Sequence, residues 1–129
     1  MRSLHEFSTA QTIIENVIKV AEKYNAKRVT EINLEIGALT MLNLEQLTFS
    51  LKILSEKTIV EGAKFKINYI PVKLKCLNCG YETVIKTESL INSEWPEFIF
   101  QLKCLKCQSK DVEVIEGRNC IIKDIKIKM

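Results

Sequence analysis

Two short stretches, CLNCG at residues 76–80 and CLKC at residues 104–107, decide how this chain is organised. In each stretch a Cys-x-x-Cys spacing turns two thiolates toward one cation, and 24 residues separate one pair from the other. Two such pairs supply the four soft ligands of a tetrahedral site. We therefore predict zinc bound by Cys76, Cys79, Cys104 and Cys107. Four thiolates leave no open position on the ion, so this site is expected to be structural and not catalytic.

Composition favours one small globular protein with no nucleic-acid or membrane partner. Of the 129 residues, 47% are hydrophobic and 27% are charged, which is too apolar for a disordered chain. The 19 basic and 16 acidic residues are well mixed and leave a net charge of only +3, so no basic stripe marks a nucleic-acid surface. No apolar run is long enough to span a membrane, and four of five cysteines sit in Cys-x-x-Cys pairs, so we expect a cytoplasmic location.

Hydrophobic periodicity predicts two helices and four strands around the cysteine segment. A three-to-four-residue period favours helices, and a period of two favours strands. The predicted helices cover residues 4–24 and 44–57, and the predicted strands cover residues 29–36, 64–70, 112–115 and 121–127. The last strand has no core of its own, so we expect it to return to the sheet formed by 29–36 and 64–70. Capping boxes are predicted at Ser3 with Glu6 and at Asn43 with Gln46.

These elements predict an α+β fold, a small mixed sheet with two helices plus an inserted zinc-ribbon-like module held by four cysteines. Residues 1–73 with 111–129 would form one discontinuous domain that binds nickel, and residues 74–110 would form the zinc module. The first helix is expected to bury one stripe of side chains, namely Phe7, Ala10, Ile13, Ile14, Val17, Ile18, Ala21 and Tyr24. Inside the module, Trp95, Phe98 and Phe100 would supply a small apolar core.

The inventory of reactive groups argues against an enzyme. His5 is the one histidine, so no Ser-His-Asp or Cys-His pair can form away from the N-terminus. The pair His5 and Glu6 has two interpretations, an exposed first helical turn with a capping Glu6 or a transition-metal site. An imidazole with adjacent deprotonated backbone amides forms a tetragonal nitrogen set, which favours Ni(II) or Cu(II). Cys120, outside both pairs, is expected to be a small buried hydrophobic residue.

Taken in order, these stretches resemble the HypA family of hydrogenase nickel-incorporation factors. The resemblance rests on HEFS at 5–8, LEIGAL at 34–39, EQLTF at 45–49, the run from Thr58 to Ala63, both cysteine pairs and Gly117. It implies a nickel metallochaperone with structural zinc on the four cysteines and nickel bound at His5 and Glu6, through a free N-terminal amine, backbone amides and the histidine ring. It also implies two partners, a HypB-type GTPase and the large subunit of nickel–iron hydrogenase.

Two positions depart from the family pattern. The family begins Met-His-Glu, whereas here Leu4 precedes His5 and residues 1–3 come before it. We expect translation to start at the codon for Leu4, read as Met, and we expect the extended form to bind nickel more weakly. At the second cysteine pair, Gln108 stands where a glycine would relieve strain in the turn.

Two alternatives to the metallochaperone follow from the cysteines alone. A four-thiolate site suits iron as well as zinc, and residues 79–82 resemble a rubredoxin knuckle, which would indicate an electron-transfer protein. A zinc-ribbon nucleic-acid-binding module is the second alternative, although the charge balance does not favour it.

Overall fold

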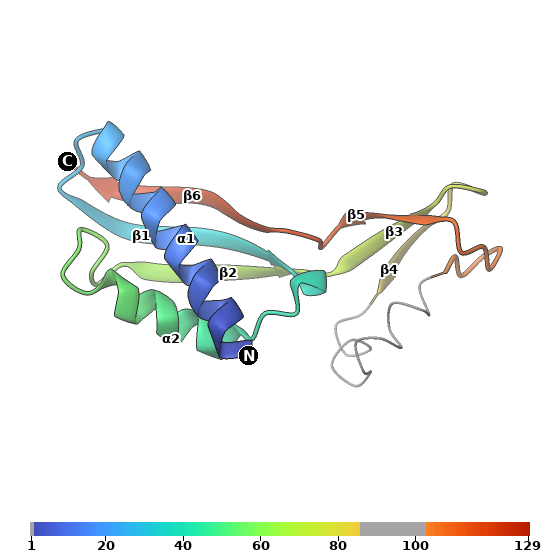
Figure 1. The fold of residues 1–129 in the computed structure, drawn as a ribbon. Helices are drawn as coiled ribbons and strands as arrows, with labels where there is room; N and C mark the ends of the chain where they lie inside the picture. The colour runs from blue at the N-terminus through green and yellow to red at the C-terminus, as the bar shows by residue number, and fades with distance from the viewer. Residues whose placement is uncertain (1, 86–102) are drawn as a thin grey trace. The chain divides into compact units, whose positions relative to one another are not determined.

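The computed structural model describes residues 2–85 and 103–129, and it has the predicted α+β architecture (Figure 1). The predictions for Trp95, Phe98 and Phe100 lie outside these residues. No helix in the described ranges is long and apolar enough to cross a membrane. In chain order the elements are α1 (Arg2–Lys23), β1 (Arg28–Gly37), the 3-10 turn η1 (Ala38–Thr40), α2 (Leu44–Ser55), β2 (Lys64–Ile70), β3 (Val72–Cys76), β4 (Glu82–Ile85), β5 (Val112–Glu116) and β6 (Cys120–Lys128).

The first sheet has the strand order β2-β1-β6, so the last strand does return to pair with the first. In Figure 1 β1 and β2 run in the same direction and β6 runs against them, which makes the sheet mixed, as predicted. The antiparallel pairing of β1 with β6 is bounded by a backbone hydrogen bond from Lys27 N–H to the Lys128 carbonyl, 2.9 Å long. Helix α2 lies between the two parallel strands in the chain, as a crossover between parallel strands requires.

A second sheet, β4-β3-β5, differs from the prediction, which has one sheet and a metal module. Its central strand pairs Leu74 with Thr83 on one side and with Val114 on the other, both antiparallel. The sequence carries a signal for this strand, because Val72, Leu74 and Cys76 alternate with two lysines and are all buried. The alternating pattern covers only a few residues, and the cysteine pair at its end favours a metal-binding loop over a strand.

Helix α1 buries one stripe, but the stripe is shifted from the predicted one at both ends. Phe7 and Tyr24 are 42% and 55% exposed, so the prediction that they face the core is wrong. Glu6 takes the inward position instead and is 1% exposed. The buried residues then follow regular three- and four-residue steps, at Glu6, Ala10, Ile13, Ile14, Val17 and Ala21.

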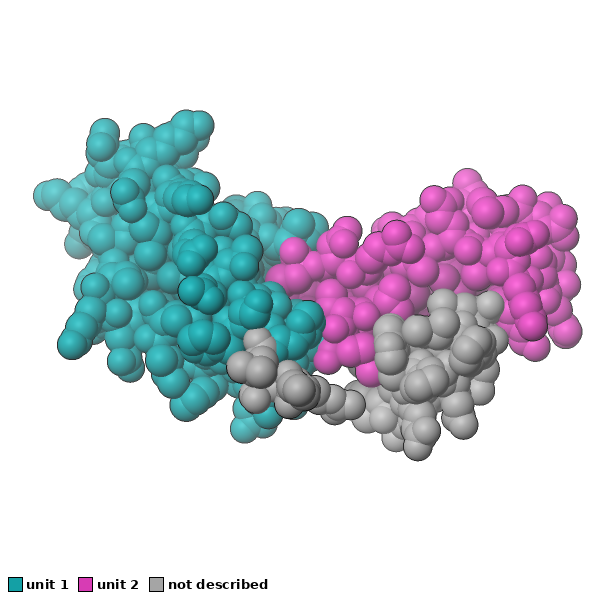
Figure 2. All heavy atoms as spheres, in the orientation of Figure 1, with its two compact units in different colours: residues 1–35, 42–68, 121–129 teal, residues 36–41, 69–120 magenta. Residues whose placement is uncertain are grey.

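The chain forms two compact units (Figure 2). Unit 1 consists of residues 1–35, 42–68 and 121–129 and contains both helices, which pack against each other. Unit 2 consists of residues 36–41 and 69–120 and contains the second sheet, whose core is built on Ala38, Val72 and Leu74. The predicted assignment of nickel and zinc to separate domains, divided at residues 73/74 and 110/111, stays a prediction.

Unit 2 contains a close backbone approach at two glycines. Gly37 N–H donates to the Asn119 carbonyl at 2.9 Å, and Leu39 N–H donates to the Gly117 carbonyl at 2.8 Å. A Cβ atom on Gly37 would lie 2.2 Å from the Gly117 carbonyl oxygen, well inside contact distance. Gly117 itself has φ +87°, and a Cβ there would lie 2.6 Å from the Pro71 carbonyl oxygen. Both positions therefore require glycine.

We predict that Gly117→Ala destabilises the protein far more than Gly62→Ala. The two glycines have nearly the same positive φ, +87° and +82°, but a Cβ on Gly62 would meet nothing within 4 Å. Gly62→Ala should therefore show only the left-handed strain of about 1 kcal/mol, whereas Gly117→Ala adds a backbone clash and should lose about 3 kcal/mol or more. Urea unfolding followed by circular dichroism measures both. Equal losses would show that the close approach at Gly117 is unimportant.

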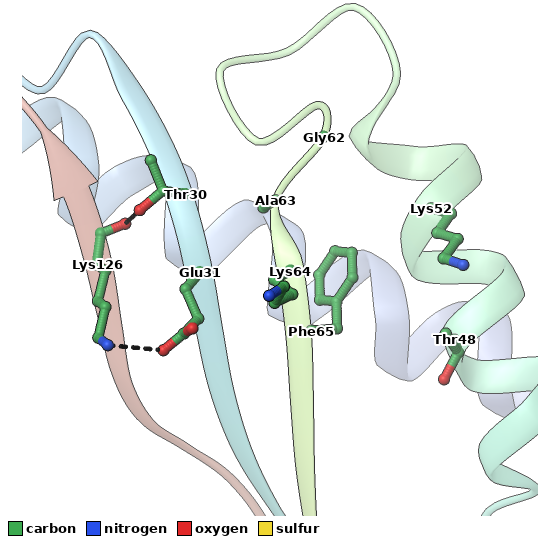
Figure 3. A pocket seen from close by; sticks show the side chains of 9 residues that line it. All are labelled: Thr30, Glu31, Thr48, Lys52, Gly62, Ala63, Lys64, Phe65 and Lys126. Atoms are coloured by element: carbon green, nitrogen blue, oxygen red, sulfur yellow. Dashed lines mark hydrogen bonds and ion pairs between the residues drawn. The ribbon is translucent and has the colours of Figure 1, made fainter.

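On the outer face of the first sheet, one carboxylate forms ion pairs with two lysines. The Glu31 carboxylate lies 3.2 Å from Lys66 Nζ of β2 and 3.2 Å from Lys126 Nζ of β6, and it accepts a hydrogen bond from Asn33 Nδ2 at 3.1 Å. These contacts, the Asn33 amide first, lower the pKa of Glu31 from 4.5 to about 2. Figure 3 shows Lys126 and Glu31 side by side among the residues that line a pocket, which also include Thr48 and Lys52 of α2. The described residues lining that pocket include no cysteine or histidine, so we assign no metal to it.

We predict that Glu31→Gln weakens the acid dependence of stability. Because the folded-state pKa of Glu31 is depressed, its ionised form stabilises the fold above about pH 4.5, and this contribution is lost as the pH falls toward 2. The difference in unfolding free energy between wild type and Glu31→Gln should therefore shrink between pH 4.5 and 2. Urea titrations across this range measure it, with Glu56→Gln as a control for removing one negative charge. A pH-independent difference would contradict the low pKa.

Candidate functional site

The four predicted cysteines come together in one cluster in unit 2. All four Sγ atoms lie within 4.8 Å of one another. Cys76 Sγ lies 3.5 Å from Cys107 Sγ, and Cys79 Sγ lies 3.6 Å from Cys104 Sγ, so each close contact joins one Cys-x-x-Cys pair to the other. Four sulfurs at about 2.3 Å from a tetrahedral ion lie about 3.8 Å apart. The cluster therefore fits a single four-coordinate metal ion.

Two similar backbone turns aim the thiolates. After Cys76, Gly80 N–H donates to the Cys76 carbonyl at 2.9 Å, and Cys79 N–H points at Cys76 Sγ at 3.4 Å. After Cys104, Gln108 N–H donates to the Cys104 carbonyl at 2.9 Å, and Cys107 N–H points at Cys104 Sγ at 3.4 Å. Amide donors of this kind stabilise negative sulfur and hold it in place.

The turns differ at the residue that follows the second cysteine of each pair. Gly80 has φ +80°, which costs glycine nothing, whereas Gln108 occupies the same left-handed region with φ +61°. A side chain in that region is strained by roughly 1–2 kcal/mol. The strain predicted for Gln108 is therefore present, and the four sulfurs meet nonetheless.

The electrostatics of the cluster favour thiolates at the buried first cysteine of each pair. Backbone N–H groups, that of Cys107 first, lower the pKa of Cys104 to about 6, and the N–H of Cys79 lowers the pKa of Cys76. The N–H of Tyr81 lowers the pKa of Cys79, but desolvation and the neighbouring sulfurs outweigh it and raise the value to about 11. A metal cation would displace the remaining protons, because the thiolate and not the thiol is the ligand. With four sulfurs bound, no position remains for a reacting group.

Cys120 lies outside this cluster. It is a free cysteine at the start of β6 and is half-buried, and burial raises the pKa of its thiol. A raised pKa makes a thiol a poorer nucleophile and a poorer ligand. Cys120 is therefore less buried than predicted, and it is not one of the four clustered cysteines.

The second predicted site, His5 with Glu6, lies in the first turns of α1. The His5 side chain is exposed, so its imidazole is accessible to an ion from solvent. Helix α1 begins at Arg2, which places the Glu6 backbone N–H opposite the Arg2 carbonyl in the regular i to i−4 pattern. Ligation of an ion through the backbone nitrogens of His5 and Glu6 therefore requires the first turn to open.

The Glu6 side chain does not form the predicted capping box with Ser3. The helix starts one residue before Ser3, and Glu6 Oε1 accepts a hydrogen bond from the Asn43 backbone N–H at 3.0 Å. Asn43 is the N-cap of α2, and its Oδ1 accepts the Gln46 N–H at 2.9 Å, as predicted. In a complete capping box Gln46 would bind the Asn43 N–H, and here Glu6 of α1 takes that place. The phase of Glu6 with Ala10 and Ile13 is the sequence signal for its burial, but no local pattern points to Asn43 as its partner.

Comparison with known proteins places this geometry in a family. The family described as "Hydrogenase/urease nickel incorporation, metallochaperone, hypA" matches residues 4–127. The hydrogenase maturation factor HypA of Methanothermobacter thermautotrophicus is 43% identical over 125 residues, which cover 97% of this chain and 98% of that relative. The hydrogenase maturation factor HypA of Methanopyrus kandleri is 40% identical, over 98% of this chain and 94% of the relative.

Solved structures share the fold. The solution structure of the Ni metallochaperone HypA from Helicobacter pylori matches with a TM-score of 0.65 and 19% identity, covering 95% of this chain and 97% of the other. At that identity the match shows the fold alone. The family model and the relatives, which match nearly the whole chain, show in addition the family to which it belongs. The chain belongs to the HypA family of nickel-incorporation metallochaperones, which are maturation factors and not enzymes.

Proposed function

We propose that this protein binds Ni(II) at its N-terminus and delivers it to the large subunit of nickel–iron hydrogenase during maturation. The observation that carries the proposal is the exposed imidazole of His5 in the first turns of α1, in a chain whose family incorporates nickel. His5 supplies the ring nitrogen, and the backbone nitrogens of His5 and Glu6 supply two more of the four nitrogens in a tetragonal set. A free amine at residue 4 would be the fourth. Ni(II) favours such a set.

The cysteine cluster is proposed to hold structural zinc. Zinc has no geometric preference of its own and is commonly bound by four cysteines in closed tetrahedral sites. The cluster joins the end of β3, through Cys76, to the turn that precedes β5, through Cys107. A metal ion bound here would therefore hold these two segments of unit 2 together, and its binding free energy would contribute to folding.

The proposed partners are a HypB-type GTPase and the hydrogenase large subunit. Relatives at 40–43% identity carry the name hydrogenase maturation factor, which supports hydrogenase as the recipient. Delivery requires nickel to leave the chaperone. A site of one imidazole and local backbone nitrogens on an accessible helix end can release its ion by refolding one helical turn, which the closed cysteine cluster cannot do.

We predict that Cys104→Ser removes the tightly bound metal and that Cys120→Ser does not. A hydroxyl is a poor replacement for a thiolate, so three sulfurs should hold the ion at least about tenfold more weakly. The purified wild type should contain one zinc per chain and be colourless by absorption spectroscopy and metal analysis. A coloured, iron-loaded protein would instead support the electron-transfer alternative.

We predict that His5→Ala abolishes nickel binding while zinc content and thermal stability persist. Removing the imidazole leaves backbone nitrogens alone, and these cannot hold the ion at neutral pH without an anchoring ligand. Isothermal titration with Ni(II) measures the stoichiometry, and far-UV circular dichroism should show a small loss of helix on loading in the wild type. Glu15→Ala, also on the exposed side of α1, is the control.

The same titration is run on a variant that lacks residues 1–3 and carries Leu4→Met. Its first amides have no upstream carbonyl to bind, so it should take up nickel more tightly than the longer chain. Unchanged nickel stoichiometry in His5→Ala would place the nickel site elsewhere and overturn the proposed function.

A further inference from the structure

Adjacent residues at the start of α1 face opposite sides. His5 is exposed, whereas Glu6 is 1% exposed and lies on the stripe that α1 buries. A carboxylate at such a position normally has all of its oxygens satisfied by donors, because burying it unpaired is costly. The burial of Glu6 therefore needs a specific explanation.

One oxygen of Glu6 has a partner and the other has none. Oε1 accepts the Asn43 backbone N–H at 3.0 Å, while Oε2 is buried without a hydrogen-bond partner among the described residues. The bond joins α1 to the N-cap of α2, 37 positions apart in the chain. A glutamine or an apolar residue at position 6 would avoid burying a charge, so stability alone does not account for the carboxylate.

We propose that Glu6 is a positioning residue for the nickel site and not a nickel ligand through its side chain. Its carboxylate, acting through the Asn43 amide, holds the backbone at residue 6 against α2 while the imidazole of His5 stays in solvent. This inference rests on the proposed function and deepens it, because it assigns the Glu6 side chain a role distinct from that of its backbone nitrogen.

The Glu6–Asn43 hydrogen bond would limit how far α1 opens when nickel binds. Ligation by the backbone nitrogens of His5 and Glu6 requires the turn before Glu6 to unwind. With residue 6 anchored to α2, unwinding stops there, and the ring and backbone nitrogens of the pair stay close together. Without the anchor, nickel must order a frayed helix end, and the entropy of that ordering weakens binding.

The test removes the Asn43 donor without touching α1. Asn43 has φ −79°, which proline can adopt, so Asn43→Pro deletes the N–H without straining the φ angle of residue 43. The proline Cδ takes the place of the hydrogen and therefore also displaces the Glu6 carboxylate, whose Oε1 lies 3.0 Å from the Asn43 nitrogen. Asn43→Ala is the matched control, because it loses the same side-chain cap on α2 but keeps the N–H. We expect Asn43→Pro to bind nickel about tenfold more weakly than Asn43→Ala, the scale of one charge-assisted hydrogen bond.

A double-mutant cycle separates positioning from ligation. In the Glu6→Ala background the proline and alanine variants at position 43 should bind nickel equally, because the acceptor is already gone. The d–d absorption bands of bound Ni(II) should be the same in wild type, Glu6→Ala and Asn43→Pro, since none of them removes a nickel ligand. Zinc content and the thermal midpoint confirm folding in each variant.

Two outcomes would overturn the inference. Equal nickel affinity of Asn43→Pro and Asn43→Ala in the Glu6 background would show that the hydrogen bond does not position the site. Altered nickel bands in Glu6→Ala would show that the carboxylate is a ligand. Failure of the proposed function looks different, since the wild type would then bind no nickel, or His5→Ala would bind it unchanged.

Discussion

A steric constraint at two glycines determines how the chain passes through unit 2. The carbonyl oxygen of Gly117 lies 2.2 Å from where a Cβ of residue 37 would be, and the carbonyl oxygen of Pro71 lies 2.6 Å from where a Cβ of residue 117 would be. Three segments far apart in the sequence, the end of β1, the link between β2 and β3, and the turn between β5 and β6, therefore meet at their backbones. The hydrogen bonds of Gly37 and Leu39 to this turn depend on the approach.

The two metals of the proposed function require opposite kinds of site. The cysteine cluster draws its sulfurs from two Cys-x-x-Cys pairs and orients them with backbone amides, so a bound ion would become part of the fold. The proposed nickel site uses adjacent residues of one helix end, where local opening would admit and release an ion. Closed sulfur ligation favours retention, and accessible nitrogen ligation favours transfer. The two proposed sites would therefore let one small chain keep one metal and pass on another.

Glu6 connects local helix structure to tertiary packing. As the reciprocal partner of the α2 N-cap, it replaces a contact that a helix usually makes within its own first turn. The first turn of α1, which carries His5, is thereby tied to the start of α2. A buried carboxyl group departs from the apolar pattern of the stripe around it, and such departures are expected near functional sites.

The sequence by itself determined the elements that local periodicity and spacing encode. These include both helices, β1, β2, β5 and β6, the grouping of the four cysteines and the candidate pair His5 and Glu6. Only the tertiary structure decided that residues 72–76 form the centre of a second sheet, that Phe7 faces solvent, and that Glu6 binds Asn43. The reason is physical. A period of two or 3.6 is set by neighbouring residues, whereas the hydrogen bond of Glu6 depends on an amide 37 positions away.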